Sequence, residues 1–168
     1  MFGNPIYFER RPSLTAYGGK LLSGAGLGAP VHAAAFIRKR LIVLETDLFA
    51  QTDRLRLILV HEIFHFAWVR LSNGERRGFA DLLVTEMQDK ARGEMGESAG
   101  VKKRFLQSRS PVDRQSRLWR DYICESFCDS AAAFFSGTAV NEYLTLAGRW
   151  AKRRRAWLLR ASEGGWRC

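Results

Sequence analysis

The sequence predicts a single α+β domain over residues 1–168, in which a small N-terminal β-sheet packs on a mostly helical core. Two apolar runs of strand length, residues 31–37 and 41–44, flank the basic segment Arg38-Lys39-Arg40 and predict a hairpin. An almost continuous apolar run within residues 53–71 is too long for a strand and is typical of a buried helix. With 46% hydrophobic residues, a chain of 168 residues is large enough to bury one core.

The first 30 residues predict short elements. Residues 6–8 are β-prone, and either a short strand or a helix fits after Ser13. Residues 18–30 are rich in glycine, but the spacing of those glycines matches no phosphate-binding loop. We therefore expect a flexible loop or a hairpin connection there.

Four more helices are expected after the apolar run. Ser72-Asn73-Gly74 is expected to end the first helix, and Ser110-Pro111 supplies a cap and a first turn for a later one that stops at Gly137. Residues 93–100 are expected to form a loop, and residues 164–168 a frayed tail. The four helices are expected at about residues 79–92, 101–107, 112–136 and 140–161.

The long apolar run contains His61-Glu62-Ile63-Phe64-His65, an HExxH pattern that uses two of the chain's three histidines. Residues four apart lie on one face of a helix, so His61 and His65 can offer two nitrogens to one metal ion. Glu62 is rotated by about 100° and can act as a general base on a water molecule. Buried imidazoles need partners, which predicts one zinc ion per chain; a hydrogen-bonded core histidine pair is the alternative.

A hydrolytic zinc site of this kind needs a third protein ligand, and no histidine follows His65. Glu125 and Asp129 are four apart on one face of an expected helix, among apolar and small residues and with no basic residue within one turn. We predict that Glu125 is the third ligand. We predict that Asp129 holds a ligand histidine by its second nitrogen.

Other residues remain as alternatives. Glu86 is the rival third ligand, although a solvated helix face explains it as well. His32, the third histidine, is expected to be structural more often than a ligand. Cys124 and Cys128 are expected to be small buried thiols, with metal ligation by one of them as a minor alternative.

HExxH followed by a helix carrying ExxxD resembles the gluzincin zinc peptidases, the thermolysin-like group. His61, Glu62, His65, Glu125 and Asp129 match that pattern one by one. The short chain and the small residues around the second acid look more like minimal gluzincins and ImmA/IrrE-type metallopeptidases. The resemblance implies a zincin-like core with an active-site helix and a second ligand-bearing helix.

Peptide hydrolysis assisted by zinc and Glu62 is the function expected from these residues, with a peptide or protein as substrate. Tyr122 is the candidate to stabilise the oxyanion, and Tyr143 and His32 are alternatives. A zinc-containing regulatory or DNA-associated protein with little or no peptidase activity is the other reading. A structural zinc protein with a closed site has no use for Glu62 beside an open water position.

The charge of the chain is uneven. The net charge is +10, and residues 101–168 carry 14 Lys or Arg and 6 Asp or Glu, which gives +8 of that total. This balance suits nucleic acid near the basic C-terminal region, but a solvated basic helix face explains it equally well. No segment is read as a signal peptide or membrane span, and three cysteines make no disulfide framework, so a cytoplasmic protein without a membrane partner is expected.

Overall fold

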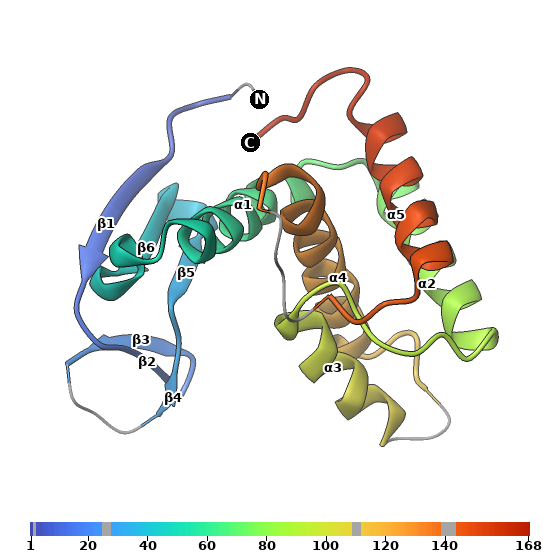
Figure 1. The fold of residues 1–168 in the computed structure, drawn as a ribbon, viewed down its shortest axis with the longest axis horizontal. Coiled ribbons are helices and arrows are strands. Elements are labelled where there is room, and N and C mark those ends of the chain that lie inside the picture. The colour runs from blue at the N-terminus through green and yellow to red at the C-terminus, as the bar shows by residue number, and fades with distance from the viewer. Residues whose placement is uncertain (2, 25–27, 109–111, 139–143) are drawn as a thin grey trace.

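A computed structural model describes residues 1, 3–24, 28–108, 112–138 and 144–168. Strands gather at the N-terminal side, helices form the rest, and the long helix α1 (Thr52–Trp68) lies between the strands and the other helices (Figure 1). The predicted α+β class, with a small N-terminal sheet region packed on helices, is therefore confirmed. The helix start predicted at Ser110-Pro111 lies outside the described residues.

Six strands form two small sheets. In the first sheet, β6 (Leu41–Glu45) lies between β5 (Ala33–Phe36), which is antiparallel to it, and β1 (Tyr7–Arg11), which is parallel. The second sheet is antiparallel, with the order β3-β2-β4. Its strands are β2 (Leu14–Tyr17), β3 (Lys20–Ser23) and β4 (Ala29–Pro30).

The predicted hairpin is present, because β5 and β6 pair with Ala34 opposite Val43. The basic segment between them forms a 3₁₀ turn, Ile37–Lys39, and Arg40 closes it in the left-handed conformation at φ 50°. The apolar β6 is largely buried, and its Ile42 and Leu44 join the same core as Phe64 and Phe66 of α1. A strand rather than a helix follows Ser13.

Helix boundaries differ from those expected where the caps were misread. Ser72 does not end α1; it is the N-cap of α2 (Asn73–Gln88), where it forms a capping box with Glu75. Likewise, Ser116 caps α4 (Arg117–Phe135) by accepting a hydrogen bond from the Trp119 N–H, so that helix begins later than expected. Two further helices also begin at residues other than those expected. Helix α3 spans Glu97–Gln107, and helix α5 spans Gly148–Ala161.

The C-terminal tail is not frayed. Trp166 is buried, and its ring lies edge-on to Phe64 of α1, with 5.1 Å between ring centroids. The same ring also contacts Phe127 of α4. The guanidinium of Arg40 donates a hydrogen bond to the carbonyl of Cys168, at 3.2 Å. Aromatic burial and this hydrogen bond hold a segment whose composition alone predicted a loose end.

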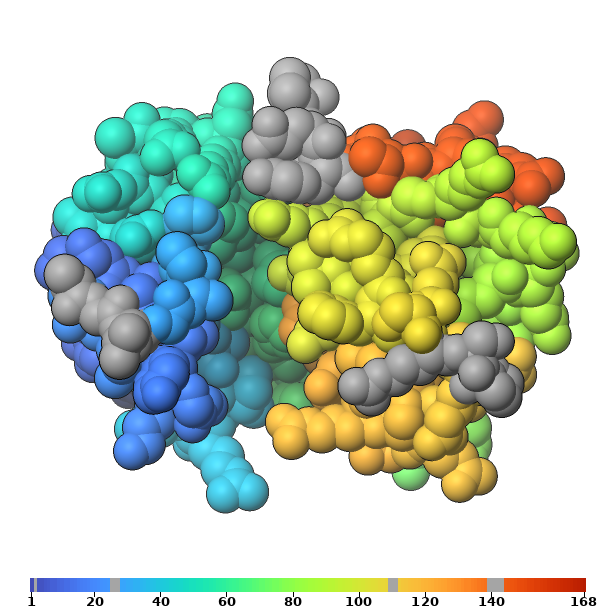
Figure 2. Space-filling view, turned by 90° about the horizontal axis from the view of Figure 1, so that it is seen from below, coloured from blue at the N-terminus to red at the C-terminus, as the bar shows by residue number. Residues whose placement is uncertain are grey.

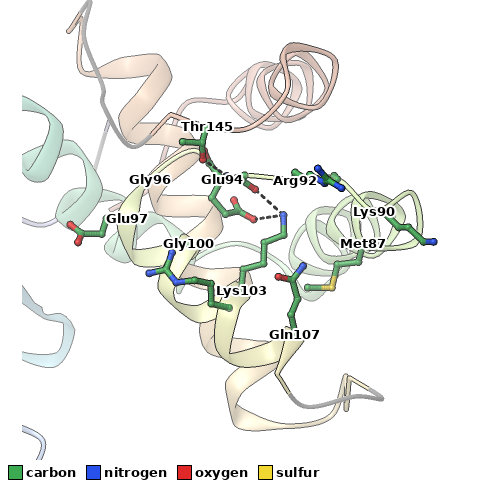
Figure 3. A pocket seen from close by; sticks show the side chains of 13 residues that line it. Met87, Lys90, Arg92, Glu94, Gly96, Glu97, Gly100, Lys103, Gln107 and Thr145 are labelled. Carbon is green, nitrogen blue, oxygen red and sulfur yellow. Dashed lines mark hydrogen bonds and ion pairs between the residues drawn. The ribbon is translucent and has the colours of Figure 1, made fainter.

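A second buried feature is the Arg154 cluster, defined here as Arg154 with Glu86, Glu94, Tyr122, Lys103, Ser126 and Ser130. Arg154 of α5 is fully buried and pairs with Glu86 at 2.5 Å and with Glu94 at 2.7 Å. Lys103 of α3 reaches Glu94 and the carbonyl of Gly93, beside a hollow of about 690 Å³ (Figure 3). The expectation that Glu86 lies on a solvated helix face is therefore wrong.

Within the described ranges, no helix combines the length and the apolar character needed to cross a membrane.

Candidate metal centre

The histidines of α1 converge as the HExxH spacing predicts. His61 and His65 project from successive turns of the helix, and their Nε2 atoms lie 3.2 Å apart. Their rings are nearly perpendicular, with centroids 4.9 Å apart. Two lone pairs on one helix face can therefore point at one position between the rings.

Glu125 of α4 completes a group of three donors. Its Oε2 atom lies 3.2 Å from His61 Nε2 and 3.9 Å from His65 Nε2. All three ligand atoms lie within 4.8 Å of one another. Metal–ligand distances of about 2.0–2.1 Å in a tetrahedral site separate the donor atoms by roughly 3.3 Å. The residues present therefore fit a zinc-sized ion with two imidazoles and one carboxylate.

Asp129, one turn after Glu125, contacts the far side of His61. Its Oδ1 lies 2.8 Å from His61 Nδ1, and its Oδ2 accepts a hydrogen bond from the Ala99 N–H at 2.8 Å. Gly96, just before α3, approaches this carboxylate so closely that a Cβ there would lie 2.4 Å from Asp129 Cγ. A His61 Nδ1–H that donates to Asp129 leaves Nε2 available for a metal.

The same contacts change the proton affinity of these side chains. Burial alone lowers the pKa of His61, but Asp129, Glu125 and Glu62 outweigh it and hold that pKa well above its ordinary value. Burial alone raises the pKa of Glu125, but His61 and His65 more than offset it and lower that pKa. These acids therefore favour a second proton on the His61 ring. A metal ion must displace that proton.

Glu62 is the acid of the HExxH motif, and it makes no ion pair or hydrogen bond with a side chain in the described part of the chain. It is only 9% exposed, and no group among the described residues donates a hydrogen bond to its carboxylate. Its oxygens are not among the fully buried side-chain atoms that lack a partner, so the carboxylate lies where solvent reaches it. Its place next to His61 in the helix leaves its oxygens available to a water molecule.

His65 has a neighbour, Cys124, that the sequence offered only as a minor alternative ligand. The Sγ atom of Cys124 lies 3.5 Å from His65 Nδ1. A hydrogen bond with Cys128, together with His65, outweighs burial and lowers the pKa of Cys124 to about 6. Burial and Cys124 raise the pKa of Cys128 well above its ordinary value. The available signal was the order of the helix residues, since Cys124 and Cys128 each stand directly before one of the two acids.

The remaining candidates lie elsewhere. Tyr122 is fully buried, and its hydroxyl donates to Glu94 at 2.5 Å, so the structure does not support it as an oxyanion stabiliser. Glu86 is held by Arg154 and does not join the group of three donors. His32 lies between Glu45, 2.7 Å from its Nδ1, and Arg54, 2.6 Å from its Nε2. Tyr143 lies outside the described residues.

The three donor side chains are reachable from solvent. Those of His61, His65 and Glu125 are 12%, 19% and 23% exposed, which leaves room for a water molecule or a substrate group. Figure 2 shows a furrow between the N-terminal strands and α3–α4, with α1 at its floor. The hollow of about 690 Å³ lies instead around Glu94 and Lys103, and none of the three donors lines it.

Comparisons with protein-family models, with curated proteins and with solved structures found no match.

Proposed function

We propose that this protein is a zinc-dependent metallopeptidase of the gluzincin type. The proposal rests on one observation: two imidazole nitrogens and a carboxylate oxygen converge within 4.8 Å, next to Glu62, whose carboxylate accepts no hydrogen bond from the described residues. A closed structural zinc site has four protein ligands, whereas a catalytic site has three and an open position. Only three donors meet here among the described residues, and they remain partly exposed.

His61, His65 and Glu125 would hold a zinc ion, which would supply Lewis acidity to a water molecule and to a substrate carbonyl. Glu62 accepts the proton of the attacking water and passes it to the leaving amine. Asp129 fixes His61 in the tautomer that presents Nε2, and it stabilises positive charge on that ring. The residue that stabilises the oxyanion is not assigned, because Tyr122 is committed to Glu94.

The substrate proposed is an extended peptide. In the first sheet β5 is an edge strand, and it packs against α1. A peptide that paired with the edge of β5 would form main-chain hydrogen bonds along Ala33–Phe36, at the side of the sheet next to α1. The furrow in Figure 2 has the same neighbours, the strands on one side and α1 at its floor.

The test compares metal content and peptidase activity in wild type, Glu62→Gln and Glu125→Ala. Wild type is expected to hold one zinc per chain by elemental analysis and to cleave an unfolded protein such as casein. Glu62→Gln should keep the zinc and lose the hydrolysis, because its amide cannot accept the proton. Glu125→Ala should lose both the zinc and the hydrolysis.

The exposed acid Glu163, substituted by Gln, is the matched control and should change neither property. Hydrolysis by Glu62→Gln at the wild-type rate would remove the assigned base. One zinc per chain in Glu125→Ala would remove the assigned ligand.

A regulatory or DNA-associated protein is the second candidate, favoured by one face of α5. Arg149, Lys152, Arg153 and Arg155 are exposed on that helix, whereas Arg154 is buried and neutralised by two acids. Such a face would bind DNA through phosphates, with an affinity that falls steeply as salt is added. Absence of DNA binding at low salt would exclude this candidate.

A further inference from the structure

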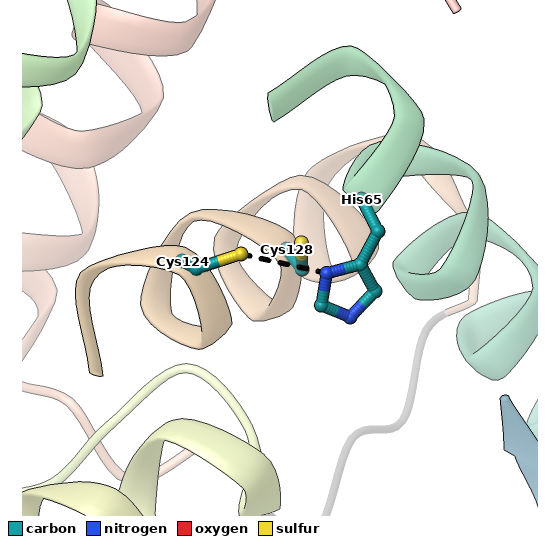
Figure 4. A group of neighbouring side chains, drawn as sticks. All are labelled: His65, Cys124 and Cys128. Carbon is teal, nitrogen blue, oxygen red and sulfur yellow. Dashed lines mark hydrogen bonds between the residues drawn. The ribbon is translucent and has the colours of Figure 1, made fainter. Parts of the chain in front are cut away.

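A second group of metal-binding side chains lies on the other side of His65. His65 Nδ1 and the Sγ atoms of Cys124 and Cys128 all lie within 4.8 Å of one another, with 3.5 Å between Nδ1 and Cys124 Sγ. Figure 4 shows Cys124 and Cys128 on α4 next to the His65 ring from α1, with the Cys124 sulfur joined to the ring by a dashed line. Both cysteines are free, Cys124 is half-buried and Cys128 is fully buried.

The donors of this group differ in kind from those of the first. Two sulfurs and one imidazole form a soft set, which favours thiophilic ions such as Cu⁺ over the hard ions that carboxylates prefer. The spacing of four residues places both sulfurs on one face of α4 without any change of backbone. Bonds of about 2.3 Å to sulfur and 2.0 Å to nitrogen suit donor atoms that lie 3.5–4 Å apart. The surroundings are acidic, because Glu125 lies near both histidines and Asp129 lies against His61.

We propose that His65, Cys124 and Cys128 form a second metal-binding site, specific for a thiophilic ion, that shares His65 with the first donor group. In this site His65 binds through Nδ1, and each thiol releases its proton on binding. The site lies where His65 and Cys124 still reach solvent, so the ion has a path of entry.

Sharing one histidine has a consequence for regulation, which rests on the proposed zinc function. A neutral imidazole carries one N–H and one lone pair. If Nδ1 binds the thiophilic ion, the proton moves to Nε2 and points at the position that zinc requires. Occupation of the thiol site would therefore remove one of three zinc ligands and stop hydrolysis. A thiophilic ion bound at the thiol site would thus inhibit the enzyme.

The binding experiment does not depend on zinc. Metal-free protein is titrated anaerobically with Cu⁺ in competition with a colorimetric Cu⁺ chelator, and near-ultraviolet absorption reports thiolate bonding to copper. Wild type should take one Cu⁺ per chain and develop this absorption. The double variant Cys124→Ser with Cys128→Ser should lose both signals while its circular dichroism stays that of wild type.

Two variants serve as controls. Cys168→Ser removes the third free thiol, which lies at the C-terminal tail, and should bind Cu⁺ like wild type. Glu125→Ala removes a ligand of the zinc position only and should also keep Cu⁺ binding, whether or not the zinc proposal holds. Equal binding by wild type and the double cysteine variant, or binding lost only in Cys168→Ser, would overturn the thiol site.

The regulatory step is tested on zinc-loaded protein. One equivalent of Cu⁺ should release the zinc, as read with a zinc indicator, from wild type and not from the double cysteine variant. Cu⁺ bound by both thiols with no zinc released would overturn the sharing of His65. A protein that holds no zinc at the start would refute the proposed function and leave the Cu⁺ result to stand by itself.

Discussion

Helix α4 carries two buried polar clusters that are built in opposite ways. On one side Ser126 and Ser130 accept hydrogen bonds from Arg154, whose charge is balanced by Glu86 and Glu94. On the other side Glu125 and Asp129 face two histidines, and in the described ranges they form no ion pair with a lysine or arginine. The Arg154 cluster is complete in itself, whereas the second side has more acceptors than protein donors. The first is therefore read as structural and the second as a place for a cation.

The largest effect is expected at the Arg154 cluster. Arg154→Ala leaves Glu86 buried without its cation and Glu94 with Lys103 alone, which should lower the free energy of unfolding by about 3–5 kcal/mol. Lys152→Ala, on the exposed face of the same helix, should change it by less than about 0.5 kcal/mol. Urea denaturation measures both. Similar stabilities of the two variants would mean that the cluster is not what holds α5 in place.

A pH dependence follows from Glu94. Burial alone raises the pKa of Glu94, but Arg154 and Lys103 outweigh it, so the pKa in the folded protein lies below the ordinary value of 4.5. The stabilisation is therefore complete above pH 4.5 and is lost as the pH falls through the folded pKa. Glu94→Gln should cost about 1.5–3 kcal/mol at neutral pH.

The free energy of unfolding of Glu94→Gln should approach that of wild type in acid, as followed by urea denaturation across the pH range. A difference that stays constant with pH would show that the charge of Glu94 contributes nothing.

Asp129 of the acid pair packs closely against Gly96, and one added methyl group tests this contact. Gly96→Ala places a Cβ 2.4 Å from Asp129 Cγ, which should cost about 1–3 kcal/mol of stability and weaken zinc binding by displacing the carboxylate. Gly100→Ala is the matched control, because the nearest atom to its Cβ is the Arg104 Nη1 at 3.6 Å. Inside α3 this change should stabilise the protein by up to about 1 kcal/mol. Thermal unfolding distinguishes the two variants, and equal shifts would contradict the contact with Asp129.

A smaller effect, on the metal alone, is expected at Asp129. Asp129→Asn keeps the size of the side chain and an acceptor for the Ala99 N–H, but it removes the charge that faces His61. Zinc affinity measured by chelator competition should fall about 10–100-fold. Asp121→Asn, on the exposed part of the same helix, should leave the affinity unchanged. An unchanged affinity in Asp129→Asn would separate Asp129 from the metal centre.

Sequence reasoning worked where a feature depends on local spacing. The pairs His61–His65 and Glu125–Asp129 are each four residues apart in one helix, so each pair shares a face before any tertiary contact is known. That these faces meet depends on how α1 packs against α4. The structure brings them together, while the catalytic roles of these residues remain predictions. The hairpin of β5 and β6 was predicted for the same local reason, from two short apolar runs.

The failures lie in pairings between distant residues. Arg154 belongs to a basic run that reads as a solvated face, and Glu86 lies 68 positions before it, so nothing local showed that they pair. Tyr122 lies one turn before Glu125, but its hydroxyl is taken by Glu94. Strands β1 and β6 are separated in the sequence by all three strands of the second sheet. No pattern in either strand predicts their parallel pairing. Buried polar groups are satisfied by whatever the fold brings near.

Three pairs of residues on α4, each four apart, follow one another without a gap: Cys124 with Cys128, Glu125 with Asp129, and Ser126 with Ser130. Each pair faces a different partner: the far nitrogen of His65, the metal centre and Arg154. An insertion of one residue after Phe127 would turn the second member of every pair by about 100° relative to the first. The composition would barely change, yet the thiol pair, the acid pair and the serine pair would all be lost at once. Within this stretch of α4, the spacing of the residues is as essential as their identity.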